Sequence, residues 1–227
     1  MIDPNKKERE DINPQEVCYR AFGLMSSKNF EEAEKLLSNM LNRTEDDVDL
    51  ALYHSTLGVL FKMKGEFKNA WRHYERAEKL LPNDPALKII SSRLLIDQFA
   101  QYSQAIKKAK KVLKIIPENR AFVHQAYTTI GLAYIKKGNK KKAIEALENS
   151  MESGFDSFIT TKNIDFNLLE ALLRKGWGED NCKAFLERAL TFARSRKETE
   201  WINTLKTMLN AFSSESIQNI DKEDTIV

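Results

Sequence analysis

Residues 53–85 read YHSTLGVLFKMKGEFKNAWRHYERAEKLLPNDP, and this stretch decides the fold. Gly58 lies within the first apolar run of the stretch, and Ala70 lies near the start of the second run. Small side chains at these two positions leave room for two helices to cross closely. Gly65 suits the left-handed residue that ends the first helix, and the closing prolines suit the end of the second. The stretch therefore predicts two antiparallel helices joined by a short turn.

The same arrangement recurs along the chain. Residues 127–147 read YTTIGLAYIKKGNKKKAIEAL, with Gly131, Gly138 and Ala143 at the matching positions. Two weaker copies keep the alanine that follows the turn, so the four turn alanines lie at positions 33, 70, 105 and 143. In the third copy Arg93 replaces the crossing glycine, which predicts local repacking at that point. Repetition at this spacing indicates an array of stacked helical pairs.

These units resemble tetratricopeptide repeats, which are antiparallel helix pairs with a period of about 34 residues. The resemblance implies an all-α fold, a right-handed α-solenoid of about five helix-turn-helix repeats followed by a C-terminal capping helix. After residue 154 the pattern fades, so the fifth pair is expected to be degenerate. We expect a flexible leader at 1–11, a superhelical domain at 12–213 with repeats at about 15–45, 51–84, 86–119, 123–155 and 164–195 and a cap at 198–213, and a disordered tail at 214–227.

The expected cap rests on one apolar helix face near the end of the chain. Its members recur at helical spacing and are Trp201, Ile202, Leu205, Met208, Leu209 and Phe212. A stack of repeats needs a final helix that covers the last apolar face and turns a polar side to water. The same face is an alternative surface for the self-association of two chains. The residues after it are polar and acidic, which is typical of disorder.

Composition excludes several classes of protein. The chain has 227 residues, 42% of them hydrophobic, and its 36 basic and 33 acidic side chains leave a net charge of +3. No run of 18 apolar residues is present, so no transmembrane helix is expected, and the first ten residues lack the apolar core of a secretory signal. Only two cysteines occur, which favours free thiols in a reducing compartment. We expect a cytoplasmic protein, with a nuclear location left open.

No catalytic constellation is evident in the sequence. The three histidines, at positions 54, 73 and 124, have no partners at metal-ligand spacing, and we interpret them as packing or surface residues. Gly176 and Gly178 lack the preceding strand and the third glycine of a phosphate-binding loop. Acidic pairs such as Glu31-Glu32 and Asp46-Asp47 lie where helices are expected to begin, and there they complement the helix dipole. The sequence predicts a protein that is not an enzyme and needs no cofactor or metal.

The resemblance places function on a concave groove lined by the first helix of each pair. The residues that match its lining are mostly apolar, which is unusual for a surface that faces water. They are Cys18, Phe22, Met25, Ser55, Val59, Lys62, Met63, Leu87, Ile90, Leu94, Asp97, Gln125, Thr128, Leu132, Ile135 and Lys136. We therefore expect an adaptor or scaffold that binds an apolar or amphipathic peptide or helix of a partner protein. In the alternative interpretation, the groove is narrow and filled by its own neighbours or by the C-terminal region.

Co-chaperone members of the family bind a peptide carboxylate with basic and amide side chains of this groove. The matching positions here hold Cys18, Phe22, Thr56, Leu87 and Ser91, none of which is charged. A carboxylate clamp needs charge-assisted hydrogen bonds, which these residues do not supply. The sequence therefore argues against binding of a chaperone tail.

A second surface is basic. Residues 104–142 carry a net charge of +10, against +3 for the whole chain. The lysines of this basic surface are Lys107, Lys108, Lys110, Lys111, Lys114, Lys137, Lys140, Lys141 and Lys142. The simpler interpretation is a solvated outer face of the array. The alternative function is electrostatic binding of an acidic protein, a nucleic acid or an anionic membrane, of which nucleic acid is less favoured because stacking aromatics and arginine forks are missing.

Overall fold

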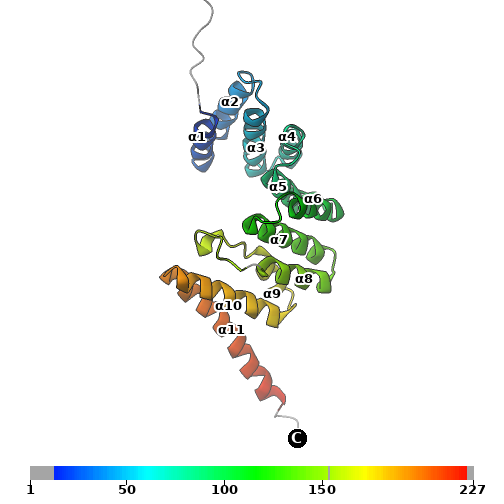
Figure 1. Cartoon of the computed structure of the whole chain (residues 1–227), viewed down its shortest axis with the longest axis vertical. Helices are drawn as coiled ribbons and strands as arrows, with labels where there is room; N and C mark the ends of the chain where they lie inside the picture. Colours follow the sequence, from blue (N-terminus) through cyan, green and yellow to red (C-terminus); the bar gives the residue numbers. More distant parts are fainter. Residues whose placement is uncertain (1–12, 153, 224–227) are drawn as a thin grey trace, which may run out of the picture. The chain divides into compact units, whose positions relative to one another are not determined.

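The computed structural model describes residues 13–152 and 154–223, with side chains as far as Phe212. The predicted leader at 1–11 lies outside the described residues. Within them the chain forms helices only, which confirms the all-α prediction (Figure 1). In chain order the helices are α1 (Pro14–Ser26), α2 (Phe30–Leu41), α3 (Asp47–Met63), α4 (Phe67–Leu80), α5 (Pro85–Asp97), α6 (Tyr102–Ile115), α7 (Arg120–Lys136), α8 (Lys140–Met151), a 3-10 turn η1 (Thr161–Asn163), α9 (Asn167–Leu173), α10 (Glu179–Ser195) and α11 (Thr199–Glu223).

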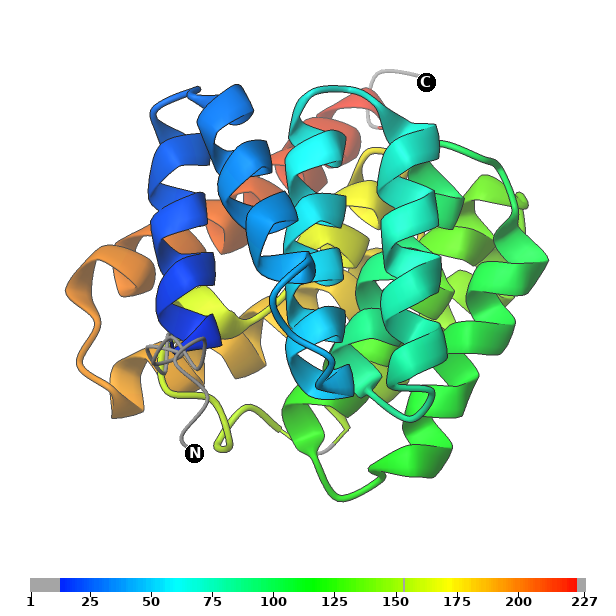
Figure 2. The same cartoon turned by 90° about the horizontal axis from the view of Figure 1, so that it is seen from above.

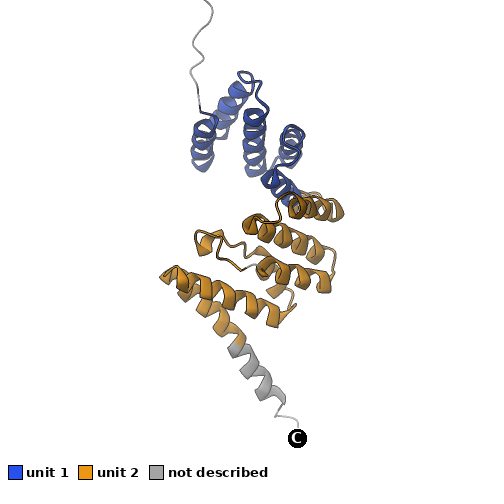
Figure 3. Cartoon of the chain, viewed as in Figure 1, with its two compact units in different colours: residues 1–94 blue, residues 95–227 orange. Residues whose placement is uncertain are grey.

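The helices divide between two compact units. Unit 1 comprises residues 1–94 and unit 2 comprises residues 95–227, so that the boundary falls within α5 (Figure 3). In unit 1, α1 packs on α2 and α3 packs on α4, and Figure 2 shows each pair side by side. In unit 2, α7 packs on α8, and α10 packs on both α9 and α11. Each unit therefore contains packed helical pairs, while the boundary separates most of α5 from α6.

The turns that follow the first helix of a pair contain a residue in the left-handed backbone conformation. Gly65 and Gly138 have φ values of 78° and 71°, in the left-handed region where the sequence placed them. Lys28, Ala100 and Lys197 adopt the same conformation after α1, α5 and α10, although each carries a side chain. After α3 the N–H of Glu66 donates to the carbonyl of Phe61 at 2.8 Å, and equivalent bonds follow α1 and α7. The turn geometry is thus preserved where its glycine is missing.

Helix α3 begins earlier than the predicted repeat at 51–84. Asp46 caps the helix, because its carboxylate accepts hydrogen bonds from the N–H groups of Val48 and Asp49 at 2.9 and 3.0 Å. An Asp at this position satisfies backbone donors that a helix start leaves without partners. The acidic pair at 46–47 therefore has the helix-initiating role that the sequence suggested. The first turn of α2 likewise contains Glu31 and Glu32.

The two repeat glycines leave room for large side chains of neighbouring helices. A side-chain carbon added at Gly58 would lie 2.3 Å from the Tyr74 ring on α4. One added at Gly131 would lie 2.3 Å from Leu168 on α9, a helix of the following pair. Each glycine therefore makes space for a large buried neighbour. At Gly58 this neighbour lies on α4, the partner helix that the sequence predicts, whereas at Gly131 it lies on α9 and not on α8.

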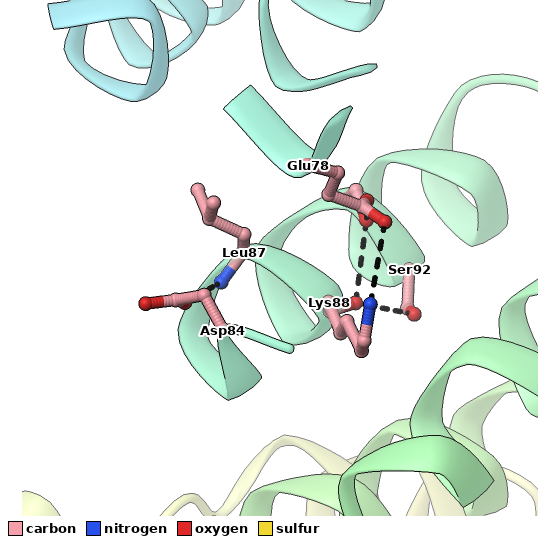
Figure 4. Close-up of polar contacts among 6 residues, drawn as sticks. Glu78, Asp84, Leu87, Lys88 and Ser92 are labelled. Carbon is pink, nitrogen blue, oxygen red and sulfur yellow. Dashed lines mark hydrogen bonds and ion pairs between the residues drawn. The ribbon is translucent and has the colours of Figure 1, made fainter. Parts of the chain in front are cut away.

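Unit 1 contains a buried ion pair between α4 and α5 (Figure 4). The Lys88 ammonium lies 3.9 Å from the Glu78 carboxylate, and the two side chains are 6% and 13% exposed. The Ser91 hydroxyl donates to the same carboxylate, and the Ser92 hydroxyl donates to the Lys88 carbonyl at 2.6 Å. A buried carboxylate is tolerated only when such partners replace its water. These contacts tie α5 to the preceding pair.

The core of unit 2 is rich in aromatic rings around His124. Phe155 and Phe158 contact the imidazole edge-on at ring-centre distances of 5.6 and 5.5 Å. The Nε2 atom of His124 accepts from the N–H of Asp165 at 2.9 Å, so Nδ1 carries the proton and donates to the Ser150 carbonyl at 2.9 Å. His124 thereby fastens the linker between α8 and α9 to α7. Its structural role agrees with the interpretation from sequence.

Helix α11 packs on α10 as the predicted cap does. Leu205 is fully buried, and the Trp201 ring stacks on Phe166 with a centre distance of 5.6 Å and an interplanar angle of 9°. The helix continues to Glu223, beyond the predicted end of the cap at residue 213. The predicted disordered tail at 214–227 includes residues outside the described part, and it stays a prediction.

Candidate functional site

The structure divides the predicted groove into buried and accessible residues. Some of them are packed inside their own unit and lack a surface for a ligand, which corrects the prediction for those positions. These buried residues are Cys18, Met25, Leu87, Leu94, Thr128 and Ile135. The half-buried ones are Ser55, Val59, Ile90, Gln125 and Leu132, and the exposed ones are Phe22, Lys62, Met63, Asp97 and Lys136. Apolar spacing alone did not separate the groove surface from the layer beneath it.

The accessible apolar residues concentrate in unit 1. Of its predicted groove residues, Phe22 is 43% exposed on α1 and Met63 is 51% exposed on α3. Two residues that the sequence analysis did not select are also exposed, namely Tyr19 at 79% and Val48 at 58%. Large apolar side chains with this much exposure point to a binding surface, because their contact with water is energetically unfavourable.

On α3 the accessible residues form one stripe along the helix. Val48, Leu52, Val59 and Met63 recur at spacings of four and seven residues, which places them on one face. Val48 was missed because the repeat was expected to begin at residue 51. The capping signal at Asp46 was available in the sequence and would have extended the helix. We name Tyr19, Phe22, Val48, Leu52, Val59 and Met63 the unit 1 apolar face.

Helices α1 and α3, which carry the unit 1 apolar face, pack against each other. The Thr56 hydroxyl donates to the Cys18 sulfur at 3.3 Å beneath this surface. Burial raises the pKa of the Cys18 thiol, and it raises the pKa of Cys182 in unit 2 to about 11. Both thiols are therefore protonated near neutral pH and behave as small apolar groups. Cys18 supports the surface from below and is not part of it.

The corresponding side of α7 in unit 2 is more covered. Thr128 is fully buried and Ile135 is 9% exposed, while the linker and α9 pack against the same helix. Among the residues of unit 2 whose side chains the structure describes, Ile159 on that linker is a prominently exposed apolar residue, at 81%. The linker is held by the Arg196 guanidinium, which donates to the Phe158 carbonyl at 3.1 Å, and by the Glu198 carboxylate, which accepts from Thr161 at 3.0 Å.

A pair of histidines joins α3 and α4 in unit 1. The two Nδ1 atoms of His54 and His73 lie 3.0 Å apart, and the His73 ring stacks on Phe61. One Nδ1 must donate and the other must accept, which requires at least one neutral imidazole. Burial lowers the pKa of His54 to about 4, with a further contribution from the neighbouring His73, and burial also lowers the pKa of His73. Both rings are therefore neutral near pH 7.

The basic surface is not uniform. Lys108 is half-buried, and the Lys137 ammonium donates to the Ser103 hydroxyl at 3.1 Å. Lys110, Lys114 and Lys142 border one pocket in unit 2. The remaining lysines of this surface are exposed outside that pocket, and they are Lys107, Lys111, Lys140 and Lys141.

Features of two other kinds of site are missing from the described part of the chain. It holds no cluster of three or more His, Cys, Asp or Glu side chains arranged to bind a metal ion. No helix within it combines the length and apolar character needed to cross a lipid bilayer.

Comparison with known proteins identifies the class of fold. Residues 124–153 match the tetratricopeptide repeat family, within the predicted repeat at 123–155. No curated protein matches the chain. With the helical pairs described above, the match defines a helical repeat protein of tetratricopeptide architecture.

Solved structures of similar fold cover most of the chain. BtubC (BKLC) from P. vanneervenii has a TM-score of 0.62 at 18% identity, covering 88% of this chain and 80% of its own. PilF of Pseudomonas aeruginosa has a TM-score of 0.60 at 14% identity, with coverages of 92% and 97%. The thermophilic TPR protein TTC0263 of Thermus thermophilus has a TM-score of 0.59 at 17% identity, with coverages of 87% and 99%. These likenesses establish the fold.

Proposed function

We propose that this protein is a non-enzymatic scaffold that binds an amphipathic helix or apolar peptide of a partner protein through the unit 1 apolar face. The observation that carries the proposal is the concentration of exposed large apolar side chains on α1 and α3. Tetratricopeptide folds bind other proteins, and the first helices of the pairs supply the binding side. The cytoplasmic location expected from the two free thiols is part of the same proposal.

The chemistry of the face suits an amphipathic ligand. Val48, Val59 and Met63 offer apolar contact along several turns of α3, and the flexible thioether of Met63 adapts to different ligand shapes. Lys62, the residue before Met63 on α3, is exposed and could pair with an acidic residue at the edge of a ligand helix. Burial of the ligand's apolar side would supply affinity, and the edge charges would supply orientation.

The test uses two matched sets of charge insertions. Phe22→Glu and Met63→Glu place carboxylates within the unit 1 apolar face, and Ile159→Glu makes the same change at an exposed apolar residue of unit 2. Partners captured from the native host by the wild-type chain are identified by mass spectrometry, and their affinities for each purified variant are measured. An unpaired buried charge costs several kcal/mol, so the double variant should weaken binding about 100-fold or more.

The control variant Ile159→Glu should bind like the wild type. All three substitutions are at exposed positions, so melting temperatures should stay within about 2 °C of the wild-type value. Affinity should also change little between low and high salt, because apolar burial dominates. Unchanged binding by a folded Phe22→Glu, Met63→Glu protein would refute the proposal. A steep loss of affinity with salt would favour electrostatic binding instead.

A further inference from the structure

A pocket of about 410 Å³ lies in unit 2 among α6, α7 and α8. Its wall on α6 consists of Lys110, Leu113 and Lys114, and its floor on α7 consists of Tyr127, Ile130 and Tyr134. The wall on α8 consists of Lys142, Glu145, Ala146 and Asn149. Each helix contributes residues three or four positions apart, so the lining is one continuous face of each helix.

The pocket is separate from the predicted groove of the same unit. A helix turns about 100° per residue, so the floor residues of α7 and the groove residue Leu132 point to opposite sides of that helix. Figure 1 shows α6, α7 and α8 as successive neighbours. The pocket therefore opens between the second helices of two pairs, a side of the fold that the proposed function leaves unused.

Charge and apolar surface are combined in this pocket. Ile130 and Ala146 are buried, Leu113 and both tyrosines are half-buried, and the three lysines are exposed. The Lys142 ammonium lies 5.3 Å from the centre of the Tyr134 ring, which holds the cation at the edge of the pocket. Within the described residues, none of the three lysines forms an ion pair, and Glu145 is the single carboxylate of the lining.

We propose that this pocket binds an acidic peptide segment of a partner protein, with one aromatic or large aliphatic side chain placed on the apolar floor. Lysines on both walls, at Lys110 and Lys114 and at Lys142, would pair with carboxylates before and after that side chain. Asn149 and Glu145 can bond the amide groups of an extended peptide backbone. The proposal is independent of any ligand on the unit 1 apolar face.

Other anionic ligands fit the pocket less well. A membrane surface is bound by protruding apolar side chains, whereas the apolar residues here line a recess between two helices. A phosphate chain is bound by arginine forks or rows of backbone N–H groups, whereas the pocket offers single ammonium groups with Glu145 between them. Carboxylates spaced along a peptide match separate lysines on two walls.

The test compares two lysine pairs on one helix. Lys110→Glu, Lys114→Glu reverses the charges that line the pocket, and Lys107→Glu, Lys111→Glu makes the same change at the same spacing outside it. The probes are fluorescein-labelled nine-residue peptides of alternating Asp and Glu, in which each of the twenty amino acids in turn takes the central position. Binding to the full chain is followed by fluorescence anisotropy, and circular dichroism melting confirms that the variants are folded.

Peptides with a central Trp, Phe or Leu should bind, and replacing that residue by Ser should weaken binding about fivefold or more. The pocket variant should bind these peptides at least about tenfold more weakly, while the control variant changes affinity by no more than about threefold. Equal loss in both variants, or equal binding with every central residue, would mean diffuse charge attraction and would overturn the proposal. Absence of binding at millimolar peptide would also overturn it. So would a 30-base single-stranded DNA or phosphatidylserine vesicles that bind the wild-type chain more tightly than the peptides do, if the pocket variant loses this binding.

Discussion

Unit 1 and unit 2 are built from the same helical pair, yet they leave different sides open. In unit 1 the first helices α1 and α3 expose apolar residues such as Phe22 and Met63. In unit 2 the α7 positions that match Leu52, Val59 and Met63 hold Gln125, Leu132 and Lys136, so this side is less apolar. A pocket lies instead between α6 and α8, where lysines surround an apolar floor. One repeat can thus present an apolar face in one place and a basic pocket in another.

The units also differ in the side chains that fill the space beside each first helix. Gly131 of α7 accommodates Leu168 from α9, and His124 fastens the linker that precedes α9, so this side of α7 is occupied. Gly58 of α3 accommodates Tyr74 from its own pair, and the stripe from Val48 to Met63 stays accessible. The space above the glycine is thus filled from the following pair in unit 2 and from the same pair in unit 1.

The units also differ in their buried polar groups. The largest effect on stability is expected when the buried ion pair of unit 1 is broken. Lys88→Met removes one buried partner of the Glu78 carboxylate and should destabilise unit 1 by about 3 kcal/mol. The same change at Lys79, an exposed residue paired with Glu75, should cost about 0.5 kcal/mol or less. Thermal melting followed by circular dichroism measures both, and the double variant Glu78→Leu, Lys88→Met should recover most of the loss.

Tryptophan fluorescence assigns that effect to a unit. Trp71 lies in unit 1, whereas Trp177 and Trp201 lie in unit 2. In a Trp177→Phe, Trp201→Phe background, the Trp71 signal should report the destabilisation caused by Lys88→Met. If the unit 2 tryptophans report an equal shift in the Trp71→Phe background, the two units unfold together and the contrast between them has no energetic meaning.

A smaller difference is expected in the response to pH. The pKa of His54 in unit 1 is lowered to about 4, below the value near 6.5 of an unfolded chain, and the pKa of His73 is lowered as well. The unfolded state therefore binds more protons between these pH values, and stability falls as the pH drops from about 6.5 towards 4. This pair should contribute about 1 to 2 kcal/mol of the loss, because its rings are only partly buried.

The variant His54→Gln isolates the part of that contribution that comes from His54. It cannot take up a proton, so unfolding measured at pH 7.5 and pH 4.5 should show a smaller pH-dependent loss than the wild type, with Trp71 as the probe. Carboxylates elsewhere titrate equally in both proteins and cancel in the comparison. A wild-type pH dependence that survives in His54→Gln would mean that other groups control the acid response of unit 1.

The smallest effect should be the same in both units. Lys28 in unit 1 and Lys197 in unit 2 adopt positive φ values of 62° and 58° at equivalent turns. Changing either to Gly should stabilise the protein by about 0.5 to 1 kcal/mol, because glycine adopts this conformation without steric cost. Gly65→Ala should destabilise by about 1 kcal/mol for the same reason. Chemical denaturation checks all three, and unequal gains at the two lysines would show that the turns are not equivalent.

The sequence was sufficient for the repeat architecture. Gly65 and Gly138 mark turns whose positive φ values glycine adopts most easily, and the alanines at positions 33, 70, 105 and 143 are each fully buried. These are local requirements of one helical pair, so they recur wherever the pair recurs. The start of α3 was placed too late because apolar spacing was given more weight than the capping residue Asp46.

The candidate site was only partly predictable. The sequence identified Phe22, Val59 and Met63, and it identified Lys110, Lys114 and Lys142 as members of a basic stretch. It could not show that Cys18 and Leu94 are buried, because the periodic spacing of apolar residues is the same on the surface of a groove and one layer below it. It also could not show which lysines share a pocket with Tyr127 and Tyr134.

The sequence by itself therefore determined the helical pair, its turns and its repetition, since these depend on residues within about 35 positions of one another. Only the tertiary structure decided what lies above Gly58 and Gly131, whether the inner face of a pair is open, and which charges meet around an apolar floor. Those properties depend on side chains from different helices that share no sequence spacing. Close packing lets one particular side chain fill the space above each glycine, and the same helical pair then presents an apolar face in unit 1 and a basic pocket in unit 2.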